Sequence, residues 1–361
     1  MRVLHFIHGL NVGGAETFLI NLLDLHLENV EFYFAIQNPE ITNRKLEKKI
    51  ASLGNDRIVV IPAFPKHFFS QFSALKEIIS SNKIDRMHIH MNAFLNPLPV
   101  YACMKLGIKA IIHSHNSSNN RGGMIGRMLH NTNKRLFSTS DQIKVACSKL
   151  AGKWMFGNDK FTVVNNAISL EPFKYSWANR NSLRDDYGIG DDEYVIGFVG
   201  RLVPAKNLDF ALTLIKEMMP AHNVRLAIVG DGPLMMLLRA KAKEYGIDQH
   251  VVFAGQQQDV ARYYNMFDVF IMPSLFEGLA FTAIEAQANG LRIIASDTVT
   301  HEIQVSDLVE FLSLDAPKES WVKAIMKHAD KSEDRIALGN RLRGSKFDST
   351  ELKSVITELY R

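Results

Sequence analysis

The chain has 361 residues and a formal net charge of +4, with 13 His, 2 Cys and 47% hydrophobic side chains. These values are typical of a globular protein and exclude a short peptide hormone, a collagen and a disordered tail. The length favours two domains at about 100 to 200 residues each, and two cysteines are too few for a disulfide framework, which favours a reducing compartment.

Short β-branched or aliphatic runs alternate with longer amphipathic segments through the first half of the chain. This alternation predicts an open, mostly parallel sheet with helices on both faces. We interpret the first run as a buried strand rather than a signal peptide, because His5 and His8 interrupt it. The expected strands of this first domain, residues 1–170, are 3–7, 31–36, 57–61, 86–90, 110–113 and 143–146.

A glycine-rich turn at residues 9–16 follows the first expected strand, and a helical pattern begins directly after it. Gly13 and Gly14 let backbone N–H groups approach a phosphate, and a helix N-terminus adds a favourable dipole. The glycine spacing is neither that of a dinucleotide-binding fingerprint nor that of a Walker loop. A tight turn without a ligand is therefore the alternative to a phosphate site.

Two histidine pairs end expected strands, His88 with His90 and His113 with His115. Side chains two residues apart in a strand point the same way, so His113 and His115 can contact one ligand together. No Cys or Asp is spaced to complete a metal site with them. Judged from the residues alone, structural histidines are the better explanation, and we assign His88 and His90 to structure.

Basic side chains are concentrated in residues 1–180, which carry 22 Lys and Arg against 12 Asp and Glu, whereas residues 181–361 carry 20 against 26. Scattered solvated lysines are one explanation, and an anionic partner is the other. Residues 121–141 mix basic with apolar side chains, which is typical of an amphipathic helix on an anionic membrane. A stripe that faces the core is the alternative. Nearby aromatic residues add a possible membrane contact: Phe64, Phe68, Phe69 and Phe72.

Polar residues and turn formers interrupt the pattern at residues 171–192, where we place the linker. The alternation then restarts, which predicts a second Rossmann-like domain at residues 193–345. The remaining residues, 346–361, have the spacing of an amphipathic helix that needs a surface to cover, for which the first domain is the candidate. The expected strands of the second domain are 194–199, 225–229, 250–253, 269–271, 292–295 and 309–312.

The first strand of the second domain is followed by a loop that contains two cations, Arg201 and Lys206. Arg201 lies at the strand end and Lys206 beside a helix start, so the pair can straddle two phosphates. Arg offers planar bidentate bonding and Lys a compact charge. A solvated surface loop is the alternative, because Lys and Arg are common on surfaces.

Two carboxylates lie in the stretch 273–290. Glu277 falls in the loop after a buried strand, and Glu285 lies on a helix that is otherwise built of small and apolar residues. A carboxylate on such a helix is costly unless something donates a hydrogen bond to it. Ribose and sugar hydroxyls are suitable donors, and glutamates that cap nearby N–H groups are the alternative.

Taken in order, these motifs resemble the retaining, nucleotide-sugar-dependent glycosyltransferases of glycosyltransferase family four. The resemblance spans nearly the whole chain and rests on residues 13–16, 200–207, 230–233 and 277–285. Residues 273–278 and 285–291 are most similar to the subgroup that builds bacterial capsular polysaccharides and exopolysaccharides. It implies an α/β fold of GT-B architecture, with two Rossmann-like doubly wound domains that face an interdomain cleft.

The resemblance also implies roles for individual residues. Arg201 and Lys206 match the diphosphate-binding pair, Glu277 the residue that contacts the donor sugar, and Glu285 the residue that holds the ribose. His115 matches the active-site histidine, and Ala280 stands where the subgroup often has proline. The expected catalytic residues are His115, Glu277, Arg201 and Lys206, and the expected donor-binding residues are Gly13, Gly14, Arg201, Lys206, Glu277, Gly278, Leu279, Ala280, Phe281 and Glu285.

The implied reaction is the retaining transfer of a hexose or N-acetylhexosamine from a nucleoside-diphosphate sugar, with a UDP-sugar expected. The implied acceptor is a growing glycan linked to polyprenyl diphosphate, in cell-surface polysaccharide biosynthesis. We expect no cofactor and no metal, because fixed cations meet the phosphates and the sequence contains no Asp-x-Asp motif.

We expect a cytoplasmic protein, because the chain has only two cysteines, and no apolar run is long enough to cross a bilayer. The basic amphipathic stretch at residues 121–141 adds the expectation of peripheral attachment to the inner face of the plasma membrane. No nucleic-acid-binding signature is present, and the glycine spacing does not fit a dehydrogenase. The alternative function is a non-catalytic glycosyltransferase-like subunit that binds nucleotide and supports a partner enzyme. The residues do not indicate the oligomeric state.

Overall fold

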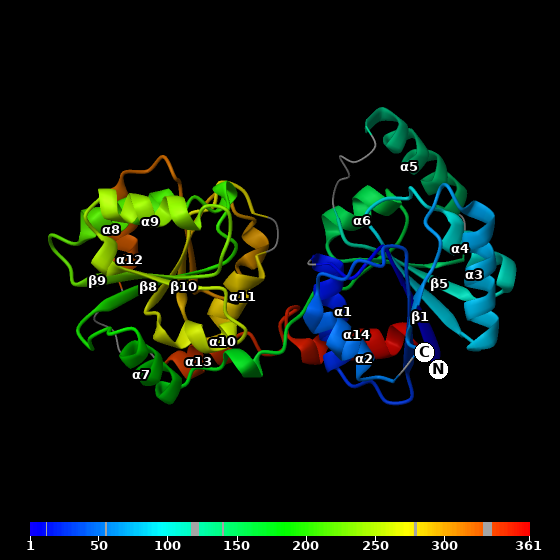
Figure 1. Ribbon diagram of the computed structural model, residues 1–361, viewed down its shortest axis with the longest axis horizontal. Coiled ribbons are helices and arrows are strands. Elements are labelled where there is room, and N and C mark those ends of the chain that lie inside the picture. The colour runs from blue at the N-terminus through cyan, green and yellow to red at the C-terminus, as the bar shows by residue number, and fades with distance from the viewer. Residues whose placement is uncertain (12, 55, 117–122, 139–140, 278–279, 328–333) are drawn as a thin grey trace. The chain divides into compact units, whose positions relative to one another are not determined.

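The computed structural model describes residues 1–11, 13–54, 56–116, 123–138, 141–277, 280–327 and 334–361. The chain forms two compact units, each built around its own sheet (Figure 1). The first unit comprises Met1–Ile168 together with Ser349–Arg361, and the second comprises Ser169–Asp348. Among the described residues, no helix combines the length and the apolar composition that crossing a bilayer requires.

The first unit contains a seven-stranded sheet in which every paired strand is parallel, in the order β3-β2-β1-β4-β5-β6-β7. Six of the strands match those expected from the sequence, and the short seventh was not expected. The strands are β1 (Arg2–Ile7), β2 (Glu31–Ile36), β3 (Ile58–Val60), β4 (Arg86–Met91), β5 (Lys109–Ser114), β6 (Ile143–Ala146) and β7 (Thr162–Val163).

Helices cover both faces of this sheet, because alternate side chains of the strands enter separate apolar cores. One core joins the sheet to α1 (Gly14–Asp24), α2 (Arg44–Ala51) and α14 (Ser349–Leu359). The other joins it to α3 (Phe68–Ser81), α4 (Leu98–Leu106), α5 (Gly123–Ser138) and α6 (Lys149–Phe156). The C-terminal helix α14 thus contributes Leu352 and Ile356 to the core of the first unit.

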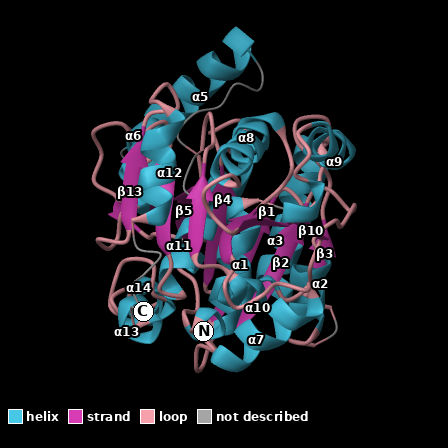
Figure 2. Cartoon of the chain, turned by 90° about the vertical axis from the view of Figure 1, so that its left-hand side faces the viewer, coloured by secondary structure: helices cyan, strands magenta, loops and turns pink. Residues whose placement is uncertain are grey.

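The second unit contains a six-stranded parallel sheet in the order β10-β9-β8-β11-β12-β13. Each unit is therefore a doubly wound, Rossmann-like α/β domain, as the sequence predicted, with strands flanked by helices (Figure 2). The strands are β8 (Tyr194–Val199), β9 (Val224–Val229), β10 (Val251–Gly255), β11 (Val269–Met272), β12 (Arg292–Ser296) and β13 (Val309–Leu312). The helices are α7 (Trp177–Asp186), α8 (Leu208–Met218), α9 (Met235–Glu244), α10 (Val260–Tyr263), α11 (Phe281–Ala288), α12 (Lys318–Met326) and α13 (Arg335–Asn340).

The segment expected as a linker, residues 171–192, contains the helix α7 and lies within the second unit. Polar contacts rather than an apolar stripe hold α7. Ser176 caps its N-terminus, and Arg180 and Arg184 form ion pairs with Asp268 at N–O distances of 2.6 and 3.4 Å. Hydrophobic periodicity does not reveal a helix of this kind.

Candidate functional site

The loops after β8 and β9 approach each other closely at the carboxyl edge of the second sheet. Gly230 has a φ of +135°, and a Cβ atom added there would lie 2.0 Å from the carbonyl oxygen of Gly200. Leu202 N–H donates to the carbonyl of Asp231 at 3.0 Å, so the two loops are bonded together. Ligands of open parallel sheets bind just beyond this edge.

Both predicted cations lie in the β8–α8 loop at this edge. Arg201 is exposed, and within the described residues no hydrogen bond or ion pair holds its guanidinium. Lys206 ends the short 3-10 helix η2 (Pro204–Lys206), next to Asn207, whose left-handed backbone begins α8. A bond from Leu275 N–H to the carbonyl of Ala205, at 2.8 Å, ties this loop to the one after β11.

The structure brings Lys206 and Glu277 together. The Lys206 ammonium donates to Glu277 Oε2, and both side chains are largely buried, at 15% and 17% exposed. The backbone of Glu277 forms a parallel bridge with Val299, which holds the backbone of the loop at this residue. The sequence allowed two roles for Glu277, contact with a sugar hydroxyl and capping of backbone N–H groups. The contacts among the described residues do not show capping.

Glu285 lies on the second turn of α11 and is half-buried. Its Oε2 accepts a 2.6 Å hydrogen bond from the hydroxyl of Tyr264, a fully buried residue. Burial, followed by the charge of Glu285, raises the pKa of Tyr264 well above its usual value, so the tyrosine stays a donor. Tyr264 therefore orients Glu285, and sequence reasoning missed it because it lies 21 positions away in the chain.

Two further predicted donor-binding residues, Ala280 and Phe281, lie at the N-terminus of α11. Ala280 is the N-cap residue, with an extended backbone and no side-chain cap, and Phe281 begins the helix. An uncapped N-terminus leaves backbone N–H groups available to an anionic ligand. The other two predicted loop residues, Gly278 and Leu279, lie outside the described residues.

Gly13 and Gly14 lie in the first unit, at the exposed N-terminus of α1. Gly13 is the N-cap, and its carbonyl accepts bonds from the backbone N–H and the hydroxyl of Thr17, at 3.0 and 2.9 Å. The side-chain amide of Asn166 donates to the carbonyl of Gly14 at 3.2 Å. These hydrogen bonds stabilise the turn. The space beside Gly14 is open, because an added Cβ atom would meet only the side chain of Asn166, at 3.8 Å.

His115 belongs to a cluster of five histidines on one face of the first sheet. The parallel register places His5 of β1 beside His88 of β4, and His90 of β4 beside His113 of β5. Since residues two apart share a face, His90 and His115 join the same group. Four of the five are buried, and Phe18 of α1 packs edge-on against His113 with ring centroids 4.7 Å apart.

Burial lowers the pKa of all five imidazoles. The pKa of His5 and of His115 falls to about 3, and the pKa values of His88, His90 and His113 lie well below 6.5. All five rings are therefore neutral at pH 7. Ring nitrogens from His5, His88 and His90, and from His90, His113 and His115, come within 4.8 Å of one another in each group.

From the sequence, His88 and His90 were assigned a structural role and were kept apart from His113 and His115. The structure places all four in one cluster. The partners of His113 and His115 in the structure are other histidines, not the Cys or Asp residues that the sequence lacks at a suitable spacing. The signal was available in part: the pairs 88/90 and 113/115 end strands that are consecutive in the chain, and consecutive strands of a βαβ unit often pair. His5 could not be included without the order of the strands.

A cavity of about 750 Å³ in the second unit lies away from these residues. It is bordered by the first residues of three strands, Tyr194, Val269 and Arg292, at the amino edge of the sheet. Because ligands of such sheets bind beyond the carboxyl ends of strands, we place the candidate site at the opposite edge, with Arg201, Lys206, Glu277 and Glu285.

Residues 179–344, most of the second unit, match the family model described as glycosyl transferases group 1. EpsF of Bacillus subtilis (strain 168), a protein named as a glycosyltransferase, is 30% identical over 343 residues, which cover 91% of this chain and 88% of EpsF. The Escherichia coli UDP-Gal:alpha-D-GlcNAc-diphosphoundecaprenol alpha-1,3-galactosyltransferase is 29% identical over 182 residues, covering 47% and 46% of the two chains.

Among solved structures, Anabaena Alr3699/HepE in complex with UDP superposes with a TM-score of 0.79. The alignment covers 100% of this chain and 99% of that one at 15% sequence identity, so it bears on the fold alone. Together with the two parallel sheets, this similarity identifies the fold as GT-B.

Proposed function

The chain belongs to the group 1 glycosyltransferases, and from this premise we propose that it transfers a hexose or N-acetylhexosamine from a UDP-sugar to a growing lipid-linked glycan. The observation that carries the proposal is the pairing of Lys206 with Glu277 beside Arg201 at the carboxyl edge of the second sheet. The UDP-sugar and the diphosphoundecaprenol-linked acceptor in the name of the Escherichia coli relative support the choice of donor and acceptor.

We assign the diphosphate of the donor to Arg201 and Lys206. Departure of a nucleoside diphosphate concentrates negative charge on its phosphates, and preorganised cations aimed at that charge are usually the largest catalytic contribution. The bond between Lys206 and Glu277 holds the ammonium in place before the donor arrives. The uncapped N-terminus of α11 adds backbone donors next to the same edge.

The two glutamates are assigned to hydroxyl groups. Glu277 accepts hydrogen bonds from the transferred sugar, and Glu285, oriented by Tyr264, accepts them from the ribose. A variant Glu285→Gln keeps the shape and weakens acceptance, which should raise the KM for the donor more than it lowers kcat.

We propose that the configuration at the anomeric carbon is retained by front-face substitution. As the bond from the anomeric carbon to the diphosphate oxygen breaks, the acceptor oxygen bonds to the same face of that carbon, and the departing diphosphate takes the acceptor proton. His115 and the N-terminus of α1 at Gly13 and Gly14 are assigned to the sugar and its phosphate. This route needs no carboxylate nucleophile.

Transfer is expected to proceed without a divalent metal, because protein cations meet the diphosphate. Excess EDTA should change the rate of UDP release less than about twofold, measured with a coupled assay on protein first stripped of metal. Loss of turnover in EDTA that Mg²⁺ restores would contradict this assignment.

The helix α5 supports a membrane-bound acceptor. Its described side chains include a stripe of apolar residues that is exposed rather than packed in the core, and basic residues alternate with that stripe. Exposed apolar stripes rimmed by cations are typical of helices that lie in a membrane interface. We therefore propose peripheral attachment to an anionic leaflet. The exposed apolar residues are Met124, Ile125, Met128, Leu129 and Leu136, and the exposed basic ones are Arg127 and Arg135, whereas Lys134 is partly buried and donates to the carbonyl of Trp154 at 3.1 Å.

Replacing four of these residues together, by M124Q, I125Q, M128Q and L129Q, should abolish sedimentation with vesicles that contain anionic phospholipid. Binding of the unchanged protein should weaken as salt rises, because part of it is electrostatic. Leu150→Gln is the matched control, since Leu150 is an exposed apolar residue of the same unit on α6. Equal sedimentation of the quadruple variant and the unchanged protein would remove α5 from the interface.

A further inference from the structure

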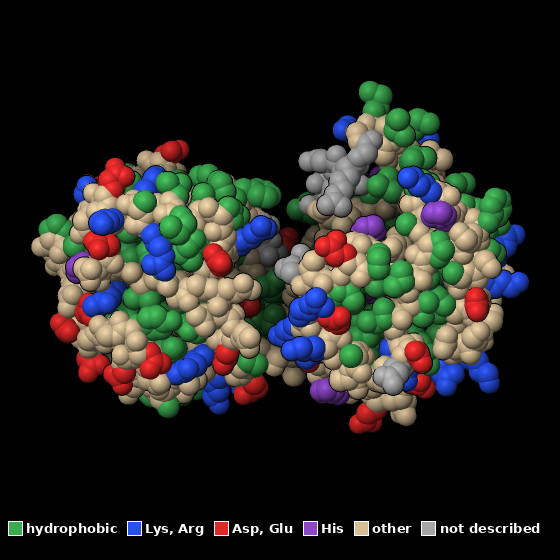
Figure 3. Space-filling view, in the orientation of Figure 1, with side chains coloured by type: hydrophobic (Ala, Val, Ile, Leu, Met, Phe, Trp, Pro, Cys, Tyr) green, Lys and Arg blue, Asp and Glu red, His purple; other side chains and the backbone are tan. Residues whose placement is uncertain are grey.

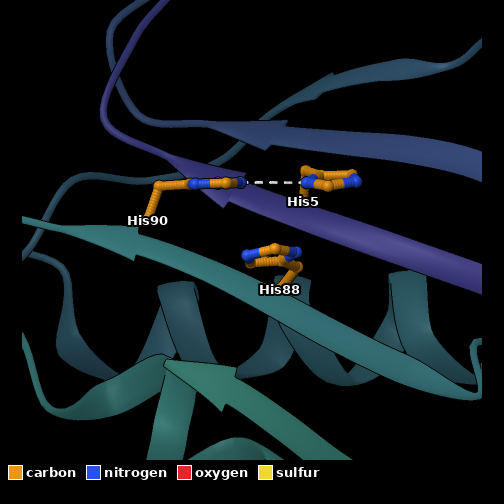
Figure 4. Close-up of side chains that lie close together, drawn as sticks. All are labelled: His5, His88 and His90. Carbon is orange, nitrogen blue, oxygen red and sulfur yellow. Dashed lines mark hydrogen bonds between the residues drawn. The ribbon is translucent and has the colours of Figure 1, made fainter. Parts of the chain in front are cut away.

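The five clustered histidines of the first unit form two separate hydrogen-bonded chains, one of which includes Tyr360. In the first, His5 Nδ1 lies 2.9 Å from His90 Nε2, and His90 Nδ1 lies 2.8 Å from His115 Nε2. In the second, the Tyr360 hydroxyl lies 2.8 Å from His88 Nδ1, and His88 Nε2 lies 3.1 Å from His113 Nδ1. Figure 4 shows His5 and His90 edge to edge, with His88 beneath them.

The rings of different chains lie over one another, stacked for His88 with His90 and tilted for His113 with His115. His88 and His90 have centroids 4.4 Å apart and planes 16° apart, and His113 and His115 have centroids 4.0 Å apart and planes 33° apart. An imidazole lone pair lies in the plane of its ring, so stacked rings direct their lone pairs along nearly parallel planes. Direct N–H···N bonds within each chain fit this geometry better than a shared metal ion does.

Each chain must have a single direction, because a neutral imidazole has one N–H donor and one acceptor nitrogen. If His5 Nδ1–H donates to His90, then His90 Nδ1–H donates to His115 Nε2, and the remaining proton of His115 is on Nδ1. If the direction is reversed, His115 Nδ1 carries no proton. The N–H that has no partner within the chain is then on His5 Nε2. Burial keeps the pKa of both end residues at about 3, so the rings stay neutral.

The surroundings of the two ends decide between these directions. Both terminal nitrogens, His5 Nε2 and His115 Nδ1, are buried and have no hydrogen-bond partner among the described residues. His5 is fully buried against the rings of Phe32 and Phe34, with centroids 5.2 and 5.3 Å away. In either direction one end of the chain carries an N–H without a partner. This costs less at His115, which is only partly buried, than at His5, which is fully buried among aromatic rings, so the nitrogen without a proton belongs at His5.

We propose that His5 and His90 are positioning residues that hold His115 in its Nδ1–H form, so that His115 presents a hydrogen-bond donor to an oxygen of the transferred sugar. The last part rests on the proposed function, whereas the tautomer is a property of the free protein. The sugar oxygen supplies the partner that His115 Nδ1 lacks within the described residues.

The tautomer is measured directly on the full chain labelled with ¹⁵N-histidine, without donor, at pH 7.5. Long-range ¹H–¹⁵N correlation distinguishes the protonated from the bare ring nitrogen, and the spectrum of His115→Gln assigns the signals. We expect the proton of His115 on Nδ1 and that of His90 on Nδ1. A proton on His115 Nε2 would overturn the proposal.

Variants of His90 separate positioning from packing. His90→Phe keeps an aromatic ring in the stack but removes both bonds, and should lower kcat more than tenfold with less than a threefold change in the donor KM. His90→Asn places an amide near the former Nδ1 and should recover most of kcat. Tyr360→Phe is the matched control, because it removes a bond of the second chain only and should leave kcat within twofold.

The outcomes are distinguishable. Wild-type kcat and tautomer in His90→Phe would refute positioning, as would an equal loss of kcat in Tyr360→Phe. A protein that transfers no sugar but has the Nδ1–H tautomer would refute the proposed function and leave the tautomer assignment intact. One equivalent of Zn²⁺ should leave the histidine ¹⁵N signals of the unchanged protein in place, and a shift of the His5 and His90 signals on addition would replace the chain with a metal site.

Discussion

Acidification from pH 7.5 to pH 5 is expected to destabilise the first unit by several kcal/mol. The five clustered histidines of this unit are neutral in the folded state and gain protons on unfolding. The pKa of His5 and of His115 rises from about 3 in the folded protein to an unfolded value of 6.5. A group whose folded pKa is lower stabilises the fold fully above the unfolded pKa, and this stability declines as the pH falls through 6.5 toward 3.

The size of the effect follows from one unit of pKa being worth about 1.36 kcal/mol. At pH 5, His5 and His115 each lose about 2 kcal/mol relative to pH 7.5, and the lowered pKa values of His88, His90 and His113 add to that loss. Domains have total stabilities of only about 5 to 15 kcal/mol. The first unit should therefore be close to unfolding at pH 5.

Hydrogen exchange measured by mass spectrometry, with intrinsic rates corrected for pH, follows the two units separately. Between pH 6 and pH 5, exchange from the first sheet should indicate uptake of at least two protons on unfolding. The second unit contains none of the five histidines and is the internal control. An uptake below one proton in the first unit would contradict burial of neutral imidazoles.

Removal of Arg201 is expected to lower kcat/KM for the donor by about 10-fold to 150-fold. This range corresponds to the loss of one charge-assisted hydrogen bond, about 1.5 to 3 kcal/mol. Lys206→Ala should lower kcat/KM by at least as large a factor. This variant also leaves the largely buried carboxylate of Glu277 without its cation. The double variant should lose more than either single one, although contacts to one diphosphate need not add.

Two further variants give this prediction its specificity, with UDP release under steady-state conditions as the measurement. Arg201→Lys keeps the charge but not the bidentate geometry, and should lie between Arg201→Ala and the unchanged protein. Lys243→Ala removes an exposed lysine of the same unit on α9, and should leave kcat/KM within twofold. An unchanged kcat/KM in Arg201→Ala would exclude Arg201 from the mechanism.

The sheets could be predicted from the sequence because each core strand is a short apolar run between amphipathic segments. Tyr194–Val199 and Glu31–Ile36 were placed residue by residue for this reason. The short strand β7 has only two residues, too few for a period to show. The helix α7 depends on ion pairs of Arg180 and Arg184 with Asp268, which lies 88 and 84 positions further along the chain, and local patterns carry no information about such a partner.

The sequence could locate those residues of the candidate site that follow a strand. Arg201 follows β8 almost directly, and Glu277 follows β11 after a short loop. What the sequence could not show are contacts that depend on the order of the strands. His5 joins His90 only because β1 and β4 are neighbours in the sheet. Tyr264 and Glu285 lie on either side of β11 and are 21 positions apart, which is beyond the reach of a local pattern. Strand order is set by how the helices pack, which no local spacing specifies.

The most direct test compares the binding of UDP with that of UMP by calorimetry, without divalent metal, for the unchanged protein and the double variant Arg201→Ala with Lys206→Ala. If these two cations receive the diphosphate, the unchanged protein should bind UDP at least about tenfold more tightly than UMP, and the double variant should lose that preference. A double variant that keeps the full preference for UDP would contradict the assignment of the donor site.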